Sequence, residues 1–427
     1  MCLLCGMLSL FSEVKNRIWY FLLGLSKVEL RASTMPAWKS LIQLAGSEFV
    51  AKLGNMLILW LLTFKYGTET QGQWSLFMLL STLLLRITSL NLGYGLRIEI
   101  SKNQCTQPFR HLAVILIAQG SLILILYFAY SLFSSVIEYK FYRILCLFVI
   151  IELAVNNSKQ ILQSYHIFKE ILIINVVRLF FRMILAISIY LTHVSISNII
   201  NFYLIIEFIM LIFMLIVLFV FAKNRSSKQL ASYSSIFRQL WSIARPGYFS
   251  SLGSFTLSKS DGLWINGFFG IAELGLYSLS KSIVNILGVV GTPLSDLASV
   301  KNENELEGFR LSLNRGNLIF FGGFLLFFVL LNSSVDLGIA VIPLDFLVLM
   351  VGAQILNTMG DFGLNMIARK YSKWGIFYIK LVLSFIVSAL LLVTVYNIRL
   401  IIMVPLVFYI GSYGYFIVIN YFTERKN

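Results

Sequence analysis

The sequence predicts an all-α polytopic membrane protein with about twelve transmembrane helices, and two observations support this fold class. Of its 427 residues, 58% are hydrophobic and only 12% are charged, whereas about a quarter of a soluble domain is charged. Apolar runs of about 20 residues, long enough to cross about 30 Å of hydrocarbon, follow one another with short polar breaks. Because these runs are continuous rather than alternating, we expect helices and not a closed barrel.

Residues 1–39 are predicted to form a cytoplasmic N-terminal segment. Their apolar start has no basic residues before it and no small-residue cleavage site, so a signal peptide is not expected. Met1 and Met35 are both candidate translation starts. The basic residues that favour a cytoplasmic location are Lys15, Arg17, Lys27, Arg31 and Lys39.

Two sets of six spans make up the rest of the chain. Residues 40–222 hold the first set and residues 240–422 the second, with a polar cytoplasmic linker at 223–239 and a cytoplasmic tail at 423–427. The expected spans are 40–64, 73–96, 111–134, 141–164, 168–191, 198–222, 240–267, 273–298, 310–331, 339–366, 372–395 and 400–421. A linker at the midpoint suggests a duplication.

Basic residues are distributed unequally between the loops of the two sides. The loops and tail on the side of the termini hold Arg97, Lys102, Arg110, Lys169, Lys223, Arg225, Lys228, Arg238, Lys301, Arg310, Arg315, Arg369, Lys370, Lys373, Arg425 and Lys426. The opposite loops hold only Lys65, Lys140, Arg143 and Arg399. This imbalance predicts that both termini are cytoplasmic. It also accounts for much of the net charge of +15, so a nucleic-acid partner is not expected.

A short repeat supports the duplication. Tyr66-Gly67-xxxx-Gly72-x-Trp74-Ser75-Leu76 in the first set recurs as Phe269-Gly270-xxxx-Gly275-x-Tyr277-Ser278-Leu279 in the second. Both copies fall in the predicted extracytoplasmic turn between the first and second spans of their set. Because six spans preserve orientation, we expect parallel repeats related by a pseudo-two-fold axis along the membrane normal.

The seventh predicted span carries Arg245, Lys259 and Asp261 within apolar sequence. A charge in hydrocarbon costs roughly 2.5–3.5 kcal/mol on the insertion scale, so charges kept there usually face a watery cavity. Arg245 precedes Pro246 near the predicted helix start, where snorkelling to the cytoplasmic surface is the alternative. This span is therefore the centre of the predicted site.

Further charged and polar residues fall inside other predicted spans. Glu48 and Lys52 lie one helical turn apart and are able to pair with each other. Arg86 is in mid-span, out of snorkelling reach, and Lys281 shares a helix face with Asn285. Three stripes of polar residues are Glu152-Asn156-Lys159-Gln163, Asn175-Arg178-Arg182 and Gln354-Asn357-Asp361-Asn365. Such stripes point inward, either to line a lumen or to join helices by hydrogen bonds.

The embedded charges are mostly basic, which predicts an anionic guest. Phosphate is the obvious one, because arginine forks bind it with two parallel hydrogen bonds. The candidate substrate-binding residues are Lys52, Arg86, Lys159, Arg178, Arg182, Arg245, Lys259 and Lys281. The candidate ion-coupling residues are Glu152, Asp261 and Asp361. These carboxylates would take protons or sodium, or alternatively only neutralise neighbouring lysines.

No catalytic, cofactor or metal site is predicted. The sequence has no P-loop and no HExxH, and its three histidines are scattered at span edges. Cys2 and Cys5 form a CxxC without a second pair or a nearby histidine, so metal or redox use is not expected. We therefore do not expect an enzyme.

Two runs, one in each set, carry a family resemblance. Residues 53–102 include YGTETQGQWSL and LNLGYGLRIEISK, and residues 245–301 include RPGYFSSLGSF, SKSDGLWINGFFGIAELGLYSL and TPLSDLASVK. In these runs and in its layout the chain resembles the polysaccharide flippases related to O-antigen transporters, within the multidrug/oligosaccharidyl-lipid/polysaccharide exporter (MOP) superfamily. The 34 residues before Met35 depart from the usual short start of this family.

The resemblance implies an architecture and a cargo. The architecture is two six-helix bundles that form a V in a bacterial inner membrane and give alternating access. The implied cargo is an oligosaccharide repeat unit on undecaprenyl pyrophosphate, for O-antigen, lipopolysaccharide or another surface polysaccharide, exchanged against protons or sodium. The implied partners are this lipid-linked oligosaccharide, membrane lipids, a polysaccharide polymerase and a chain-length regulator.

Other functions predict other features. A multidrug exporter of the same superfamily would need a cavity of net acidic character for cationic drugs, and the embedded charges here are mostly basic. A polysaccharide polymerase or ligase would need a large extracytoplasmic loop, whereas the loops predicted on that side are short. A lipid II flippase would carry extra helices. The flippase of lipid-linked repeat units is therefore the first expectation.

Overall fold

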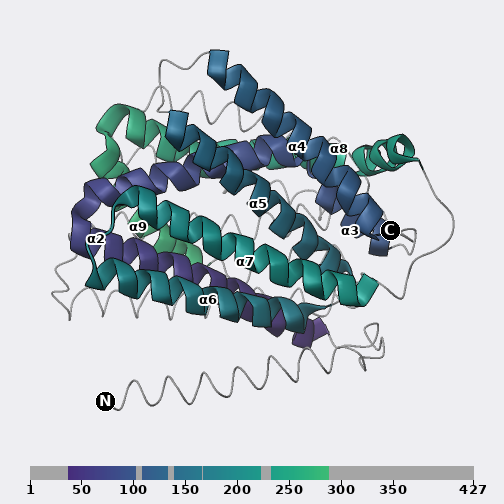
Figure 1. Ribbon diagram of the computed structural model, residues 1–427, viewed down its shortest axis with the longest axis horizontal. Helices are drawn as coiled ribbons and strands as arrows, with labels where there is room; N and C mark the ends of the chain where they lie inside the picture. Colours follow the sequence, from purple (N-terminus) through teal and green to yellow (C-terminus); the bar gives the residue numbers. More distant parts are fainter. Residues whose placement is uncertain (1–36, 102–107, 133–138, 166, 223–231, 288–427) are drawn as a thin grey trace, which may run out of the picture.

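The computed structural model describes residues 37–101, 108–132, 139–165, 167–222 and 232–287 (Figure 1). Within these ranges the chain forms eight helices. They are α2 (Ala37–Ser89), α3 (Leu92–Ser101), α4 (Pro108–Leu132), α5 (Tyr139–Ser164), α6 (Phe168–Leu191), α7 (Ile196–Ala222), α8 (Tyr233–Phe269) and α9 (Ile271–Leu287). The last four predicted spans and Asp361 lie outside the described residues.

Helices α4 to α7 agree with the third to sixth predicted spans to within three residues at every boundary. Five described stretches are long and apolar enough to cross a membrane. They are Gln43–Ser89, Phe109–Ala129, Phe141–Ser164, Phe168–Leu191 and Ile196–Val220. Helix α8, which holds the seventh predicted span, is not among them.

Helix α2 contains the first two predicted spans and reverses direction at a single residue. Gly67 has φ 82° and ψ 179°, a conformation essentially restricted to glycine. Figure 1 shows α2 folding back on itself. The first limb is therefore 37–66 and the second limb 68–89. The turn expected to extend past Gly72 is wrong in length, because Gly72 is already helical.

The second predicted span ends earlier than expected. Leu90 and Asn91 both have positive φ, at 47° and 51°, so α2 stops at Ser89 instead of continuing to residue 96. The Asn91 carbonyl oxygen then accepts from Tyr94 N at 3.0 Å at the start of α3. Arg86 therefore lies in the last turn of α2.

Helix α8 begins earlier than the seventh predicted span. Ser232 caps it, because the Ser232 side chain accepts from Ser235 N at 3.2 Å. Pro246 therefore lies inside the helix, and Arg245 does not mark its start as predicted. Helix α9 follows after Gly270 alone, with φ 96° and ψ 176°.

Apolar packing holds the described helices together. One buried cluster gathers around Trp74, Phe77 and Tyr203, and the edge of one ring meets the face of the other in the Trp74–Tyr203 pair at 5.1 Å between centroids. A second cluster joins α3, α4, α5, α6, α7 and α8. Helices α4, α6 and α7 expose large apolar side chains, as at Leu191, which is 71% exposed. Apolar surface outside and charged groups inside suit hydrocarbon rather than water.

Replacing Gly67 by alanine is expected to lower the free energy of unfolding by about 1–3 kcal/mol. A Cβ at Gly67 would meet nothing within 4 Å, so the cost comes from the backbone conformation alone. The thermal unfolding midpoint of detergent-solubilised protein measures it. Gly120→Ala is the matched control, because Gly120 also has open space but no positive φ. Equal midpoints for the two variants would contradict the prediction.

Candidate functional site

Four cations and one carboxylate gather where α2 meets α8 and α9. We call this group the lysine cluster: Lys52, Arg86, Lys259, Lys281 and Asp261. Lys259 of α8 is its centre, because it interacts electrostatically with the other four. The Lys52 ammonium donates to the carbonyl oxygen of Asn285 at 3.1 Å, so the cluster joins the two predicted sets of spans.

Asp261 neutralises one of these cations. The Lys281 ammonium donates to Asp261 Oδ2 at 2.6 Å, the Tyr277 hydroxyl donates to the same oxygen, and Gly262 N donates to Oδ1 at 2.8 Å. Tyr277 and Lys281 reach the carboxylate together because they lie four residues apart on one face of α9. Among the described residues, Lys259 has no hydrogen-bond or ion-pair partner, although it is partly buried. The cluster thus keeps an excess of positive charge.

An ion pair one helical turn from Lys52 of the lysine cluster links α2 to α5. Lys159 of α5 forms an ion pair with the Glu48 carboxylate of α2. Glu48 thus forms its ion pair with Lys159, although Lys52, the partner that the spacing within α2 allows, still interacts electrostatically with Glu48 and Lys159.

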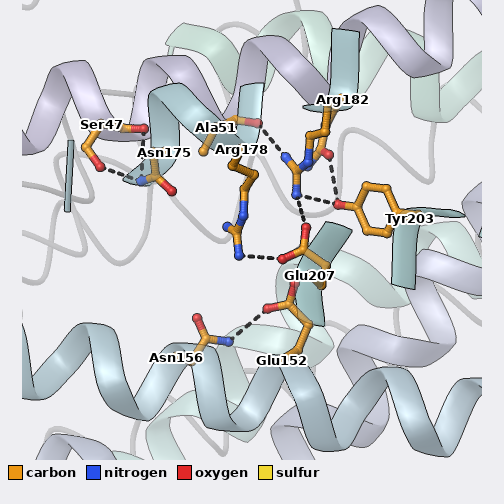
Figure 2. Close-up of polar contacts among 10 residues, drawn as sticks. Ser47, Ala51, Glu152, Asn156, Asn175, Arg178, Arg182, Tyr203 and Glu207 are labelled. Atoms are coloured by element: carbon orange, nitrogen blue, oxygen red, sulfur yellow. Dashed lines mark hydrogen bonds and ion pairs between the residues drawn. The ribbon is translucent and has the colours of Figure 1, made fainter. Parts of the chain in front are cut away.

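Two arginines share one buried carboxylate on α7 (Figure 2). Arg178 Nη2 donates to Glu207 Oε2 at 2.5 Å and Arg182 Nη2 donates to Glu207 Oε1 at 2.7 Å. Arg182 also donates to the Tyr203 hydroxyl at 2.6 Å and to the Ala51 carbonyl oxygen at 3.0 Å. We call Arg178, Arg182, Tyr203, Glu207 and Glu152 the arginine cluster.

Glu152 lies beside this group and is held more loosely. It accepts from Asn156 Nδ2 at 3.5 Å, four residues along α5, and interacts electrostatically with Glu207, Arg178, Arg182 and Lys159. The stripe Asn175-Arg178-Arg182 faces the first limb of α2, where Asn175 donates to Ser47 Oγ at 2.5 Å (Figure 2). Asn175 therefore joins two helices by a hydrogen bond, which is one of the two roles that the sequence predicts for polar stripes.

The two clusters differ in charge balance. Among the described residues, basic and acidic side chains are equal in number in the arginine cluster and in the Lys159–Glu48 pair. In this described part of the chain the lysine cluster holds four cations and one carboxylate, and Glu48 is a further carboxylate neighbour of Lys52. Within the described ranges no three His, Cys, Asp or Glu side chains are placed to hold a metal ion. The chemistry that this arrangement offers is the binding of an anion at the lysine cluster.

The remaining predicted residues lie apart from these contacts or join them differently. Arg86 has an exposed side chain within the lysine cluster, and Arg245 is exposed on α8 outside both clusters. The stripe on α5 is divided between partners, since Gln163 Oε1 accepts from Arg97 Nη1 at 3.4 Å. Helix spacing therefore predicts which residues share a helix face, but it does not predict which residues of other helices they contact.

Three residues of the clusters were not among the predicted site residues. Glu207 is the single charged residue of α7, an otherwise apolar helix, and this isolation was the available signal. Tyr203 lies four residues before Glu207, and Tyr277 four before Lys281, so the same spacing argument applied to tyrosines would have found both. Their hydroxyls contact Arg182 and Asp261.

Comparison with known proteins identifies the fold. No family model matches the sequence, and no curated protein matches it. Solved structures do match: an outward-facing multidrug resistance MATE family transporter of the MOP superfamily aligns with a TM-score of 0.65 and 13% identity over 94% of this chain and 100% of that one. A MATE protein in the straight conformation aligns with a TM-score of 0.67 and 13% identity over 92% and 98% of the two chains. The chain has the fold of MOP superfamily transporters.

A third MOP structure shows that this fold is used with different sites. A MOP superfamily transporter from Pyrococcus furiosus, described as having a binding pocket of reverse polarity that suggests a different function, aligns with a TM-score of 0.64 and 14% identity over 92% and 98% of the two chains. The described part of this chain is all-helical, and five of its stretches are long and apolar enough to cross a membrane. Its cargo has to be argued from its own charges.

Proposed function

We propose that the protein is a flippase that carries oligosaccharide repeat units linked to undecaprenyl pyrophosphate from the cytoplasmic to the outer leaflet of a bacterial inner membrane. The observation that carries the proposal is the lysine cluster, where Lys259 lacks a hydrogen-bond or ion-pair partner among the described residues and lies near three other cations. Lysines and an arginine drawn from three helices suit a pyrophosphate, which presents several anionic oxygens. Alternating access between the two predicted sets of spans would carry the lipid headgroup across.

The charge balance separates this proposal from the runner-up. Two of the three solved structures described above are MATE proteins, and one of them is described as a multidrug resistance transporter. This favours a multidrug exporter as the second candidate. A cationic drug would meet four cations and one carboxylate at the lysine cluster, and like charges in a low-dielectric interior repel strongly. The same charges attract pyrophosphate. The anionic cargo is therefore the better supported of the two.

The proposed coupling residues divide between the clusters. Asp261 belongs to the lysine cluster, and Glu152 accompanies the arginine cluster with only an amide within hydrogen-bonding distance among the described residues. We expect protons or sodium to act on these carboxylates or on Asp361. Translocation in vesicles should then depend on a pH or sodium gradient. A rate that responds to neither gradient would contradict the coupling.

Replacing Lys259 by methionine is expected to weaken binding of undecaprenyl pyrophosphate at least tenfold. A charge-assisted hydrogen bond contributes roughly 1.5–3 kcal/mol, and about 1.4 kcal/mol corresponds to a factor of ten. Binding is measured by tryptophan fluorescence with the protein in nanodiscs, with a cationic dye as the competing class of ligand. Lys169→Met is the control, because Lys169 is exposed at the start of α6.

The outcome of this titration decides between the two candidates. Tighter binding of the cationic dye by Lys259→Met, with no change for the pyrophosphate lipid, would favour the multidrug exporter.

In the native host, deletion of the gene should cause lipid-linked repeat units to accumulate on the cytoplasmic face. Unpolymerised units on the outer face would instead point to a polymerase.

A further inference from the structure

The two copies of the sequence repeat, 203 residues apart, fold into the same turn. Gly67 has φ 82° and ψ 179°, and Gly270 has φ 96° and ψ 176°. Few residues other than glycine adopt this conformation, so agreement in both angles is a specific likeness between the repeats. Figure 1 places the two turns at the same end of the helices.

The repeats contact each other reciprocally. A Cβ added to Gly72 would lie 1.9 Å from the Ile271 carbonyl oxygen, and a Cβ added to Gly275 would lie 2.2 Å from the Thr68 carbonyl oxygen. Gly72 and Gly275 hold equivalent positions in the repeats, and so do Thr68 and Ile271. Such an exchange of partners is the pattern of a two-fold contact. Any side chain larger than hydrogen at either glycine would force the two helices apart.

Two serines mark the axis of this contact. Ser75 Oγ and Ser278 Oγ lie 2.5 Å apart, and these residues are again equivalent in the two repeats. A residue that meets its own equivalent lies on the two-fold axis. We call Gly72, Ser75, Gly275 and Ser278 the glycine contact. Small groups of this kind let helices approach closely without interlocking large side chains.

The glycine contact lies directly beside the lysine cluster. Ser278 and Lys281 are three residues apart on α9, which is about 4.5 Å of helix rise. Lys281 is bound to Asp261 within the cluster. The contact therefore separates the cluster from the side of the two turns, which the distribution of basic residues predicts to be extracytoplasmic.

A second close approach joins the two predicted sets at the opposite end. A Cβ on Gly95 would lie 2.7 Å from the Leu240 carbonyl oxygen, and the Tyr248 hydroxyl donates to the Ile87 carbonyl oxygen at 3.1 Å. Along the described seam, the lysine cluster thus lies between two closed ends.

We propose that the glycine contact is the outer closure of the transport path. It opens when the two repeats move away from their two-fold axis, and this releases an anionic lipid-linked substrate. This rests on the proposed function, because a closure matters only if a substrate passes between the repeats. Helices α2 and α9 separate during release, while the turns at Gly67 and Gly270 keep their shape. The alternative is a permanent packing contact that merely joins the repeats.

Cross-linking distinguishes the two. In a background lacking the native cysteines, Ser75→Cys with Ser278→Cys should form a disulfide on mild oxidation and lower translocation of the undecaprenyl pyrophosphate-linked unit at least tenfold. Reduction should restore the rate, and either single variant should respond to neither treatment. Wild-type rates in the cross-linked protein would overturn the closure, and so would a failure of the two cysteines to cross-link.

A distance measurement tests the closure without any transport assay. Spin labels at Glu69→Cys and Glu273→Cys occupy exposed positions beside the contact. We expect two distance populations in nanodiscs, with undecaprenyl pyrophosphate shifting their ratio. A single short distance with and without the lipid would overturn the closure even if the wild type transports. Two distance populations in a protein that does not transport this lipid would support the closure but would contradict the proposed cargo.

Discussion

Alanine in place of Glu207 is expected to lower the free energy of unfolding by about 3–5 kcal/mol, the range measured when one partner of a buried ion pair is removed. Glu207 is fully buried at 0% exposure and is the carboxylate that Arg178 and Arg182 share. Its loss leaves two guanidinium groups in an apolar interior, where Glu152 and, for Arg178, Glu48 are the nearby carboxylates among the described residues. The thermal unfolding midpoint and the yield of folded protein measure the effect.

Glu69→Ala is the matched control for this substitution. Glu69 is also on a long helix but its side chain is exposed, so a change within about 0.5 kcal/mol is expected. Glu207→Gln should fall between the two, since an amide still accepts from one arginine but carries no charge. If Glu207→Ala and Glu69→Ala unfolded at the same temperature, the arginine cluster would contribute little to the stability of the fold.

Asparagine in place of Asp261 is expected to change stability and binding in opposite directions. The substitution removes the counter-charge of Lys281, which lowers the free energy of unfolding by about 1–3 kcal/mol. The same substitution removes a negative charge beside Lys259 and Lys281, so undecaprenyl pyrophosphate should bind roughly tenfold more tightly, about 1.4 kcal/mol. Thermal unfolding and lipid titration of the same preparation measure both.

Tyr277→Phe separates the charge from the hydrogen bond. It removes one donor to Asp261 and leaves the charges of the cluster unchanged, so a loss of about 1 kcal/mol in stability is expected without tighter binding. Weaker binding of the lipid by Asp261→Asn than by wild type would mean that Lys281 is not part of the anion site.

The helices of the first set were predictable because their lengths follow from hydrophobic thickness. Helix α6 spans Phe168–Leu191, as expected, since most of its residues are apolar and polar residues lie at both of its ends. The end of α2 was missed because the turn at Leu90 and Asn91 contains neither glycine nor proline. Asn91 was the available signal, since asparagine tolerates positive φ better than most residues.

The chemistry of the site was predictable only in part. Sequence spacing found most of the embedded cations, because charge within an apolar run is conspicuous. It did not find their partners: Glu48 binds Lys159 in another helix, and Arg178 and Arg182 converge on Glu207. These pairings depend on which helix faces meet, and one helix's periodicity contains no information about its neighbour. The charge excess at Lys259 became visible only after the pairs were known.

The unbalanced charge of the lysine cluster has a consequence for energetics. Among the described residues the cluster holds four cations and one carboxylate. If it is the carrier site that we propose, each elementary charge that crosses the full membrane field gains or loses about 2.3 kcal/mol per 100 mV. A negative interior would draw the empty site toward the cytoplasmic side, whereas bound pyrophosphate would cancel that pull. The voltage across the bilayer would then reset the unloaded carrier, and its return rate in vesicles would rise with an imposed potassium diffusion potential.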